Sequence, residues 1–573
     1  MRDLEIGVSY SKNTIHRHDT GKRLPENMDA VRRYANTLEC TSEEREELAT
    51  AYIFSCLLNI GMQSEEAIRI VQNNHFTPND MDSLMLAADE AIKRGAFAEA
   101  TIWLHAAKKL HRQIEKLAMP IEMMLGEAAY GAGHLRQASK HFENALTQIG
   151  LSRPKSKVGI LFDLVKQLSQ YFLYRFVLRL PKRSYSEKEK IGLHSGDRLT
   201  HAYFVNNDKL LTAYYVFKGL NHVESLADSL EVFNYRARFY AKTAVICGAV
   251  KLLQPFAEQY IEAATEAMAI GNDPYTQSII STVIGMYYYG QGDWQKVVEF
   301  CEDGIEAARE IHHWRHEAEA SALIASTHYY WKSNWQLSFA SYDVLEEEAR
   351  KYGDEQIQGL IQVANGLKHL HSGNLKEAQS NLQRANSLAM RAEDEFLLIV
   401  TGGLLGQVFL RQGEIDLAEH HADLVIKKVM HAPLMPGNAE GLRRAVEYHL
   451  FRAEQSPSHA HLEQAKQACQ RLKNYAELFP RSWPMYHAYK GWYYWLVGRY
   501  SKAAHHGIKG CQIANQLEIY YDEGVGYYLL GRNILRHTAN KRHEALAHLK
   551  AARTILLSLD AVYELEEIER LLA

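Results

Sequence analysis

A short pattern of small and large apolar residues recurs along this sequence and restricts the folds open to the chain. Its clearest copy lies in residues 125–146, where Gly126 and Ala138 are small, Phe142 is large, and Gly133 stands in a polar break. Small residues let two helices approach closely, and large ones fill the space between them. The copy therefore predicts a helical hairpin with its turn at Gly133.

The turn position of this pattern returns at a nearly constant spacing. Gly292, Ser333, Gly373 and Gly413 follow one another at intervals of 41, 40 and 40 residues. One hairpin cannot bury its own apolar face, so consecutive hairpins must stack on each other. The pattern resembles the tetratricopeptide repeat (TPR), with a period longer than the usual ~34 residues. The resemblance implies an all-α fold: an α-α superhelix, or TPR solenoid.

The first 40 residues read differently from the repeats. Residues 11–25, SKNTIHRHDTGKRLP, carry Ser, Thr, Ile, Gly and Pro at set positions. This string resembles the recognition-helix segment of the Cro/C1-type (XRE-family) helix-turn-helix, whose usual form is S-x-x-T-I-S-x-W-E-x-G-x-x-x-P. The family fold has a further helix before the one that ends near Val8, and the sequence starts too late to contain it. We therefore expect a small, partial N-terminal helix-turn-helix domain.

In that family the recognition helix lies in the major groove of DNA. The resemblance implies that base edges are contacted by Lys12, Asn13 and Arg17, and phosphates by Ser11, Lys22 and Arg23. Arginine and lysine suit guanine, asparagine suits adenine, and serine or basic groups near a helix start suit phosphate. The implied partner is operator DNA.

Composition and charge exclude several classes of protein. Apolar content of 47% and charged content of 23% are typical of an ordinary soluble protein. A net charge of −4 gives no chain-wide attraction to nucleic acid, so DNA contact requires a local patch. The six cysteines are scattered without a CxxC pair, which indicates reduced thiols. No signal peptide opens the chain, and the most apolar stretch, 158–180, contains four charged residues, so we expect a cytoplasmic protein without a membrane span.

The inner wall of the predicted superhelix is the candidate binding site. In TPR arrays the first helix of each hairpin lines a concave groove, commonly through its twelfth and thirteenth residues. Mapped onto this chain, these positions are Tyr130, Tyr289, Tyr330, Trp331, Leu370, His371, Leu410, Arg411 and Trp495, with Trp492 one turn before Trp495. An aromatic groove with an occasional cation suits a peptide or protein effector. The alternative interpretation is that these aromatic residues pack neighbouring repeats together.

Metal binding and catalysis have no support in the sequence. Among 28 histidines, His312 and His316 would share a helix face, but no third ligand follows at a set spacing and HExxH is absent. Neither a nucleophile elbow nor a carboxylate pair at a diagnostic spacing is present. We therefore expect no enzyme, no cofactor, no metal site and no catalytic residue.

These features give the expected organisation and function. We expect a partial Cro/C1-type helix-turn-helix in residues 1–40, a helical linker in 41–80, TPR repeats in 81–150, a basic helix and linker in 151–198, TPR repeats, degenerate at first, in 199–430, and TPR repeats with a C-terminal cap in 431–573. The arrangement resembles the peptide-pheromone-sensing regulators of Gram-positive bacteria. It implies a DNA-binding transcriptional regulator, acting as a homodimer on two half-sites, whose solenoid binds a peptide or protein effector. The alternative is a TPR scaffold or adaptor for protein–protein interaction with a vestigial helix-turn-helix that does not bind DNA.

Overall fold

The computed structural model describes residues 81–573, apart from Arg94, Ala96 and the segments 112–117, 177–181, 430–434 and 538–540. The predicted helix-turn-helix and helical linker therefore lie outside the described residues. The same holds for the six predicted DNA-binding residues, Ser11, Lys12, Asn13, Arg17, Lys22 and Arg23.

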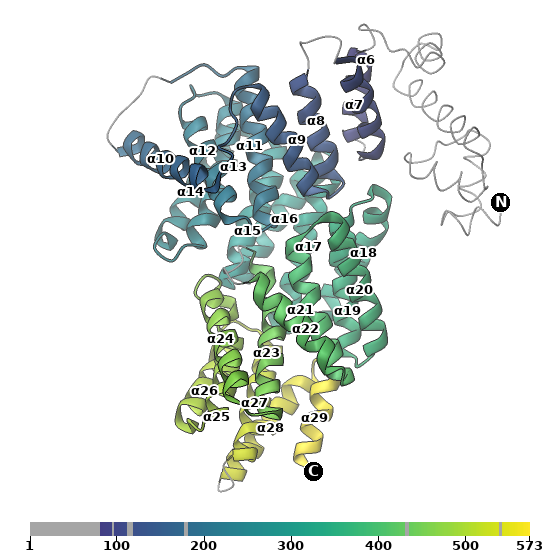
Figure 1. Cartoon of the computed structure of the whole chain (residues 1–573), viewed down its shortest axis with the longest axis vertical. Helices are drawn as coiled ribbons and strands as arrows, with labels where there is room; N and C mark the ends of the chain where they lie inside the picture. The colour runs from purple at the N-terminus through teal and green to yellow at the C-terminus, as the bar shows by residue number, and fades with distance from the viewer. Residues whose placement is uncertain are drawn as a thin grey trace, which may run out of the picture. The chain divides into compact units, whose positions relative to one another are not determined.

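The described part of the chain is all-helical, as predicted. It contains 24 α-helices, α6–α29, and its one extended pairing is an isolated bridge between Arg183 and Leu226. Among the described helices, none is both long and apolar enough to cross a membrane. The helices form two compact units, which are considered separately (Figure 1).

The first unit comprises the described residues up to Arg153 together with Glu187–Arg198 and Glu348–Asp354. Its complete helices are α6 (Met81–Lys93), α7 (Phe97–His111), α8 (Ala118–Gly131) and α9 (Leu135–Gln148). Helices α8 and α9 are the hairpin predicted from residues 125–146. A Cβ at Gly126 would lie 2.6 Å from the Phe142 ring, so the small residue is what lets the two helices approach.

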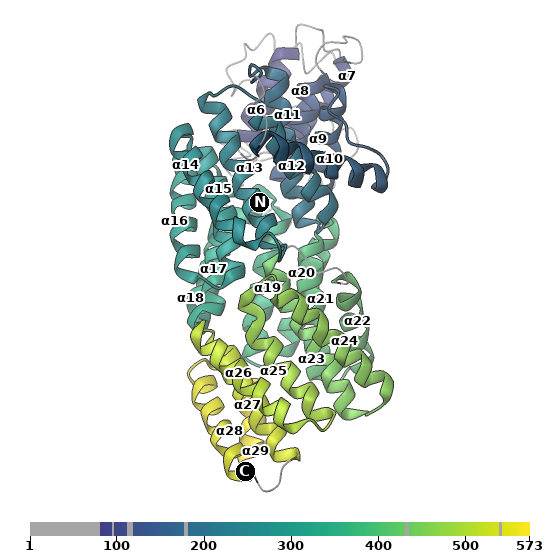
Figure 2. The same ribbon diagram turned by 90° about the vertical axis from the view of Figure 1, so that its left-hand side faces the viewer.

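The second unit comprises Pro154–Ser186, Leu199–Glu347 and Glu355–Ala573. Its helices are α10 (Lys157–Phe176), α11 (Glu187–Val205, from Leu199 onward), α12 (Lys209–Glu224), α13 (Leu230–Gly248), η2 (Gln254–Phe256), α14 (Ala257–Gly271), α15 (Pro274–Gln291), α16 (Trp294–Glu310), α17 (Trp314–Tyr330), η3 (Trp331–Ser333), α18 (Trp335–Tyr352, to Glu347), α19 (Glu355–His371), α20 (Leu375–Ala392), α21 (Glu395–Gln412), α22 (Ile415–Lys428), η4 (Pro436–Asn438), α23 (Ala439–Gln455), α24 (His459–Ala476), η5 (Pro480–Ser482), α25 (Trp483–Leu496), α26 (Tyr500–Gln516), α27 (Tyr520–His537), α28 (Arg542–Leu557) and α29 (Val562–Leu572). Consecutive helices pair as hairpins, and each hairpin packs on the next, so the unit is a TPR solenoid (Figures 1 and 2).

The predicted turn residues lie between the two helices of a hairpin and have positive φ. Gly292, Gly373 and Gly413 have φ of 82°, 78° and 84°, a region that glycine enters without strain. Ser333 takes the same position in its repeat at φ 48°, despite its side chain. In the degenerate segment, Asn207 supplies the left-handed residue between α11 and α12.

The solenoid is closely packed where α21 meets α23. A Cβ at Gly403 would lie 2.2 Å from the backbone oxygen of Gly441, and a Cβ at Gly441 would lie 2.2 Å from the backbone oxygen of Ile399. The two helix backbones therefore touch, and only glycine fits at both positions. This contact fixes α23, which carries several charged residues of the candidate site.

The second unit also makes contacts between segments far apart in its sequence. The Nε1 atom of Trp294, at the start of α16, donates to the backbone oxygen of Leu517, 223 residues later, at 2.7 Å. The turn between α26 and α27 thereby meets the segment from α15 to η3. Superhelical winding, and not only contact between neighbouring hairpins, determines which side chains become buried.

Candidate functional site

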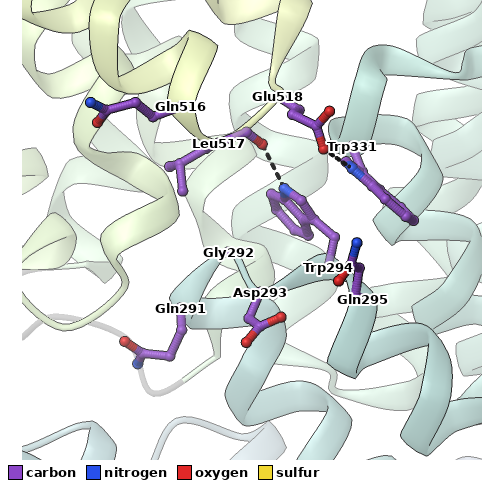
Figure 3. Close-up of a pocket in the computed structure, with 9 residues that line it drawn as sticks. All are labelled: Gln291, Gly292, Asp293, Trp294, Gln295, Trp331, Gln516, Leu517 and Glu518. Carbon is purple, nitrogen blue, oxygen red and sulfur yellow. Dashed lines mark hydrogen bonds between the residues drawn. The ribbon is translucent and has the colours of Figure 1, made fainter.

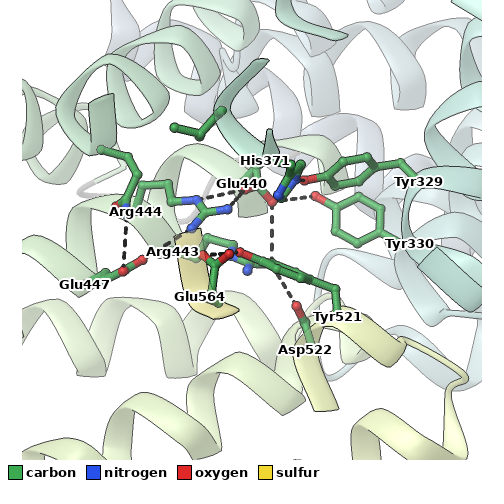
Figure 4. A network of polar contacts seen from close by, with 12 residues as sticks. Tyr329, Tyr330, His371, Glu440, Arg443, Arg444, Glu447, Tyr521, Asp522 and Glu564 are labelled. Carbon is green, nitrogen blue, oxygen red and sulfur yellow. Dashed lines mark hydrogen bonds and ion pairs between the residues drawn. The ribbon is translucent and has the colours of Figure 1, made fainter. Parts of the chain in front are cut away.

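The first helices of successive hairpins in the second unit contribute to one buried polar cluster, which we call the inner network (Figure 4). Its members are Tyr329 and Tyr330 on α17, His371 on α19, Arg411 on α21, Glu440, Arg443, Arg444 and Glu447 on α23, Tyr489 on α25, Tyr521 and Asp522 on α27, and Glu564 on α29. Because the repeat length is nearly constant, Tyr330, His371 and Arg411 occupy equivalent positions in three consecutive repeats.

Charged residues of α23 form the centre of the inner network. Arg444 donates through Nε to Glu440 Oε1 at 3.0 Å, and the hydroxyl of Tyr330 donates to Glu440 Oε2 at 2.9 Å. Burial alone would raise the pKa of Glu440, but Arg443 and Arg444 lower it below its usual value, so this carboxylate stays ionised.

Arg443 connects α23 to α27. Its Nη1 atom donates to Asp522 Oδ1 at 2.8 Å, and its guanidinium lies over the ring of Tyr521, 5.4 Å from the ring centre. Burial raises the pKa of Asp522, although the neighbouring Arg443 opposes the change. The pair is fully enclosed by protein, so removing either partner would leave an uncompensated charge.

His371 lies among the arginines in its neutral form. Its Nε2 atom shares a hydrogen bond with the hydroxyl of Tyr329 at 2.8 Å, and its ring stacks on Trp335 with centroids 3.8 Å apart. Burial, then the charges of Arg444, Arg411 and Arg443, lower its pKa well below the usual value.

Arg411 joins α21 to the last helix of the chain. It donates through Nη2 to Glu564 Oε1 at 2.6 Å, and Glu564 lies 153 residues later in the sequence. The same carboxylate oxygen accepts from the hydroxyl of Tyr521 at 3.0 Å. The C-terminal helix therefore closes the inner network at one end.

A stacked arginine extends the inner network toward α15. The guanidinium of Arg481 lies against two tyrosine rings, 4.4 Å from the ring centre of Tyr289 and 4.3 Å from that of Tyr330. Its Nη2 atom donates to the backbone oxygen of Pro436 at 2.6 Å. The two tyrosines predicted to line a groove are in edge contact, with ring centroids 6.2 Å apart, and both rings are covered by a cation of the chain itself.

A second feature, which we call the seam, is the contact of Trp294, Trp331, Lys332 and Ser333 with residues 517–521 (Figure 3). Trp331 Nε1 donates to Glu518 Oε2 at 2.7 Å, and the backbone nitrogen of Lys332 donates to the backbone oxygen of Glu518 at 2.6 Å. The backbone nitrogen of Tyr521 donates to Ser333 Oγ at 2.8 Å. Lys332, Ser333 and Glu518 all have positive φ, so this contact is made by strained backbone on both sides.

A pocket of about 330 Å³ opens beside the seam. Its lining includes Gln291, Asp293, Trp294, Trp331, Gln516 and Glu518, with the indole nitrogens of both tryptophans directed to the opposite turn (Figure 3). A smaller cavity of about 70 Å³ lies inside the solenoid and is lined mostly by aromatic and aliphatic side chains, among them Tyr289, Tyr329 and Tyr330.

The structure brings some of the predicted groove residues together and separates others. Tyr289, Tyr330, His371 and Arg411 lie in or beside the inner network, and Trp331 belongs to the seam.

Three further predicted groove residues lie elsewhere. Tyr130 is in the first unit, where the guanidinium of Arg198 lies 4.2 Å from its ring centre. Trp492 is covered by Arg532 at 4.3 Å, and Trp495 contacts the ring of Tyr500 at 4.9 Å.

Trp331 and Leu410 are half-buried, the side chain of Arg411 is 1% exposed, and the other groove side chains are buried by the chain's own helices. In this arrangement their contacts are those of residues that pack the repeats together, which was the alternative interpretation. Binding of an effector through them stays a prediction.

The sequence reading missed the charged members of α23, α27 and α29. One signal could have found them: Arg443 and Arg444 stand inside the run GLRRAV, where every neighbour is small or apolar. Charges within an apolar helix face indicate buried pairing or function. Asp522, the partner of Arg443, and Glu564, the partner of Arg411, carry no such signal. Among the described residues, no cluster of three or more histidine, cysteine, aspartate or glutamate side chains is placed to hold a metal ion.

Comparisons with known proteins return structural likeness only. No family model matches the chain, and no curated protein matches it. One similar solved structure is a Rap protein complexed with competence and sporulation factor, at 12% identity and a TM-score of 0.44, covering 70% of this chain and 98% of the other. Another is the APC/C hetero-tetramer Cut9–Hcn1, at 13% identity and a TM-score of 0.42, covering 97% and 99%. With TM-scores below 0.5, neither likeness bears on the site.

Proposed function

We propose that this protein is a cytoplasmic receptor of TPR type, whose second unit binds a peptide or protein partner and thereby regulates transcription through the N-terminal segment. The observation that supports partner binding is the inner network: arginines and carboxylates from α21, α23, α27 and α29 meet inside the solenoid.

Buried ion pairs are a poor means of stabilising a fold. Replacing such pairs with apolar side chains of similar volume is often neutral or stabilising by about 1–4 kcal/mol. A chain that needed only a packed solenoid could therefore use leucine and alanine at Arg443 and Arg444. We infer that the charges are retained for recognition, because a partner that enters the solenoid meets the inner helices first.

The cytoplasmic location is supported by the thiols. Cys247, Cys301, Cys469 and Cys511 are buried and free, and burial raises the pKa of each, to about 11 for Cys247 and about 12 for the others. Burial makes these thiols unreactive, and free thiols without disulfides are typical of proteins in a reducing compartment.

Selection of peptides from a pool tests partner binding. The full-length protein is incubated with random-sequence heptapeptides, bound peptides are identified by mass spectrometry, and individual affinities are measured by calorimetry. We expect retained peptides to share a sequence pattern and to bind with a Kd in the micromolar range or tighter. Retention without enrichment of any sequence at peptide concentrations up to 1 mM (about −4 kcal/mol of binding free energy) would refute peptide binding.

Regulation of transcription rests on the resemblance of residues 11–25 to a recognition helix. An electrophoretic shift with DNA from the promoter of the protein's own gene tests it. Arg17→Ala is expected to weaken binding by ~1–3 kcal/mol at one base position, whereas an equal loss on all sequences would mean that Arg17 touches only phosphate. Absence of any shift, together with retained peptide binding, would favour the adaptor function over the regulator. A homodimer is expected on DNA, because such domains read two half-sites.

A further inference from the structure

One donor edge within the inner network has no hydrogen-bond partner among the described residues. Arg443 uses Nη1 for its hydrogen bond to Asp522, but its Nε and Nη2 atoms make no hydrogen bond with any described residue. The residue is only 3% exposed, so water does not satisfy this edge from outside. A buried guanidinium edge without an acceptor costs free energy and requires an explanation.

The two atoms form the fork that arginine presents to a planar anion. Nε–H and Nη2–H are parallel and match the spacing of the two oxygens of a carboxylate, which gives a bidentate, charge-assisted pair. The attachment of Nη1 to Asp522 and the ring of Tyr521 fix the plane of this guanidinium. The fork is therefore held in a fixed plane in the closed solenoid.

The carboxylates of the inner network are already engaged elsewhere. Glu440 accepts from Arg444 and Tyr330, Glu447 accepts from Arg444 and Tyr489, and Glu564 accepts from Arg411 and Tyr521. None of them is hydrogen-bonded to the free edge of Arg443.

Further polar atoms without a hydrogen-bond partner lie in the same cluster. The Nε atom of Arg411 and the Nδ1 atom of His371 also make no hydrogen bond within the described chain. Four arginines, with Arg481 included, face four carboxylates, and His371 adds no charge. Glu564 Oε2 also makes no hydrogen bond within the described residues. Within the inner network, Arg443 is the residue that leaves two neighbouring N–H groups of one guanidinium without an acceptor, and a carboxylate from outside the protein would accept from both.

We infer that the free edge of Arg443 binds a carboxylate of the partner, either a peptide C-terminus or an aspartate or glutamate side chain. This inference rests on the proposed function and names the chemical group that the solenoid recognises. Both sources present the same two oxygens to the same fork, so the experiment must tell them apart.

Access to Arg443 passes through the seam. Residues 518–522 connect the seam to Arg443. Glu518 and Tyr521 are hydrogen-bonded to Trp331, Lys332 and Ser333, and Asp522 accepts a hydrogen bond from Arg443. When the seam separates, the start of α27 moves away from α23 and the fork becomes accessible. The strained backbone at the seam lowers the free energy of that separation.

The test uses three pools of random heptapeptides on the full-length protein. The first has a free C-terminal carboxylate and no acidic residues, the second has a C-terminal carboxamide and no acidic residues, and the third has the carboxamide with aspartate and glutamate included. We expect retention of the first pool, if the C-terminus is the ligand, or of the third, if a side chain is. The second pool is expected to bind at least about tenfold more weakly, since a hydrogen bond to a charged group contributes that much.

Arg443→Lys is the variant that tests the fork, because lysine keeps the positive charge beside Asp522 but has no planar pair of N–H donors. Arg238→Lys is its control: Arg238 is equally buried, and its Nε and Nη2 atoms both donate to Thr276 Oγ1, at 3.0 and 2.6 Å. We expect Arg443→Lys to lose at least about tenfold in affinity for the preferred pool, and Arg238→Lys to lose none.

The outcomes separate this inference from the proposed function. Equal retention of all three pools by the wild-type protein, or equal affinity in Arg443→Lys and Arg238→Lys, overturns the carboxylate inference and leaves peptide binding in place. Failure of the wild-type protein to retain any pool overturns both. If Arg443→Lys does not fold, judged by circular dichroism, the comparison of the three pools on the wild-type protein decides alone.

Discussion

The contact of α21 with α23 gives the sharpest prediction about the fold. A Cβ added at Gly403 would stand 2.2 Å from the backbone oxygen of Gly441 and 2.5 Å from its Cα. Neither atom belongs to a side chain that can rotate away, so the two helices must separate. At the adjacent Gly402, a Cβ would meet only a methyl group of Val425, at 3.1 Å.

The expected magnitudes follow from two opposing effects. Replacing a helix-interior glycine with alanine gains about 0.5–1 kcal/mol of stability. Overpacking a core costs about 1–3 kcal/mol, and more where backbone is the obstacle. We therefore expect Gly402→Ala to lie within about 1 kcal/mol of the wild-type protein, and Gly403→Ala to be destabilised by about 2 kcal/mol or more.

Hydrogen exchange of the amides in α21 and α23 is the suitable assay, because a repeat protein of this length does not unfold as one cooperative unit. A loss of about 2 kcal/mol corresponds to exchange about 30-fold faster through local opening. Helices distant from the contact, such as α13, serve as the internal reference. Equal protection of α21 and α23 in Gly402→Ala and Gly403→Ala would refute the close backbone approach.

Three further predictions concern single contacts. Burial lowers the pKa of His487 to about 3 and that of His506 to about 4, and their Nδ1 atoms are hydrogen-bonded at 2.9 Å. Because unfolded histidine titrates near ~6.5, stability is lost as pH falls below that value, by about 1–2 kcal/mol between pH 7 and pH 5 after allowance for exposure. His506→Gln should flatten this dependence, measured by hydrogen exchange of the amides in α25 and α26. Trp331→Phe removes the hydrogen bond to Glu518, so we expect peptides to associate faster in stopped-flow measurements; an unchanged association rate would exclude opening of the seam. Glu393 ends α20 at φ 52°. Glu393→Gly should stabilise α20 by about 0.5–1 kcal/mol, measured as slower hydrogen exchange of its amides, whereas faster exchange would show that the side-chain contacts of Glu393 outweigh the backbone strain.

Three members of the inner network could be located from the sequence, but their burial and their charged partners could not. Equal spacing places Tyr330, His371 and Arg411 at one repeat position, which is why all three lie in the inner network. The same spacing says nothing of Asp522 or Glu564, because they pair with helices more than one repeat away.

The sequence by itself determined the repeating unit. Small residues such as Gly126, large ones such as Phe142, and turn residues such as Gly373 report contacts within a hairpin or between adjacent hairpins, and those contacts recur with the period of the chain. Such local packing depends on residues that lie only a few helical turns apart in the sequence, so it can be predicted from their spacing.

Only the tertiary structure decided that the inner wall is closed by the chain itself. The small rotation from each hairpin to the next accumulates over many repeats until Leu517 reaches Trp294, 223 residues away. No spacing in the sequence encodes the accumulated rotation, because the rotation at each interface is set by the shapes of the side chains that meet there. The burial of Arg443, and the free edge that it leaves, follow from this winding.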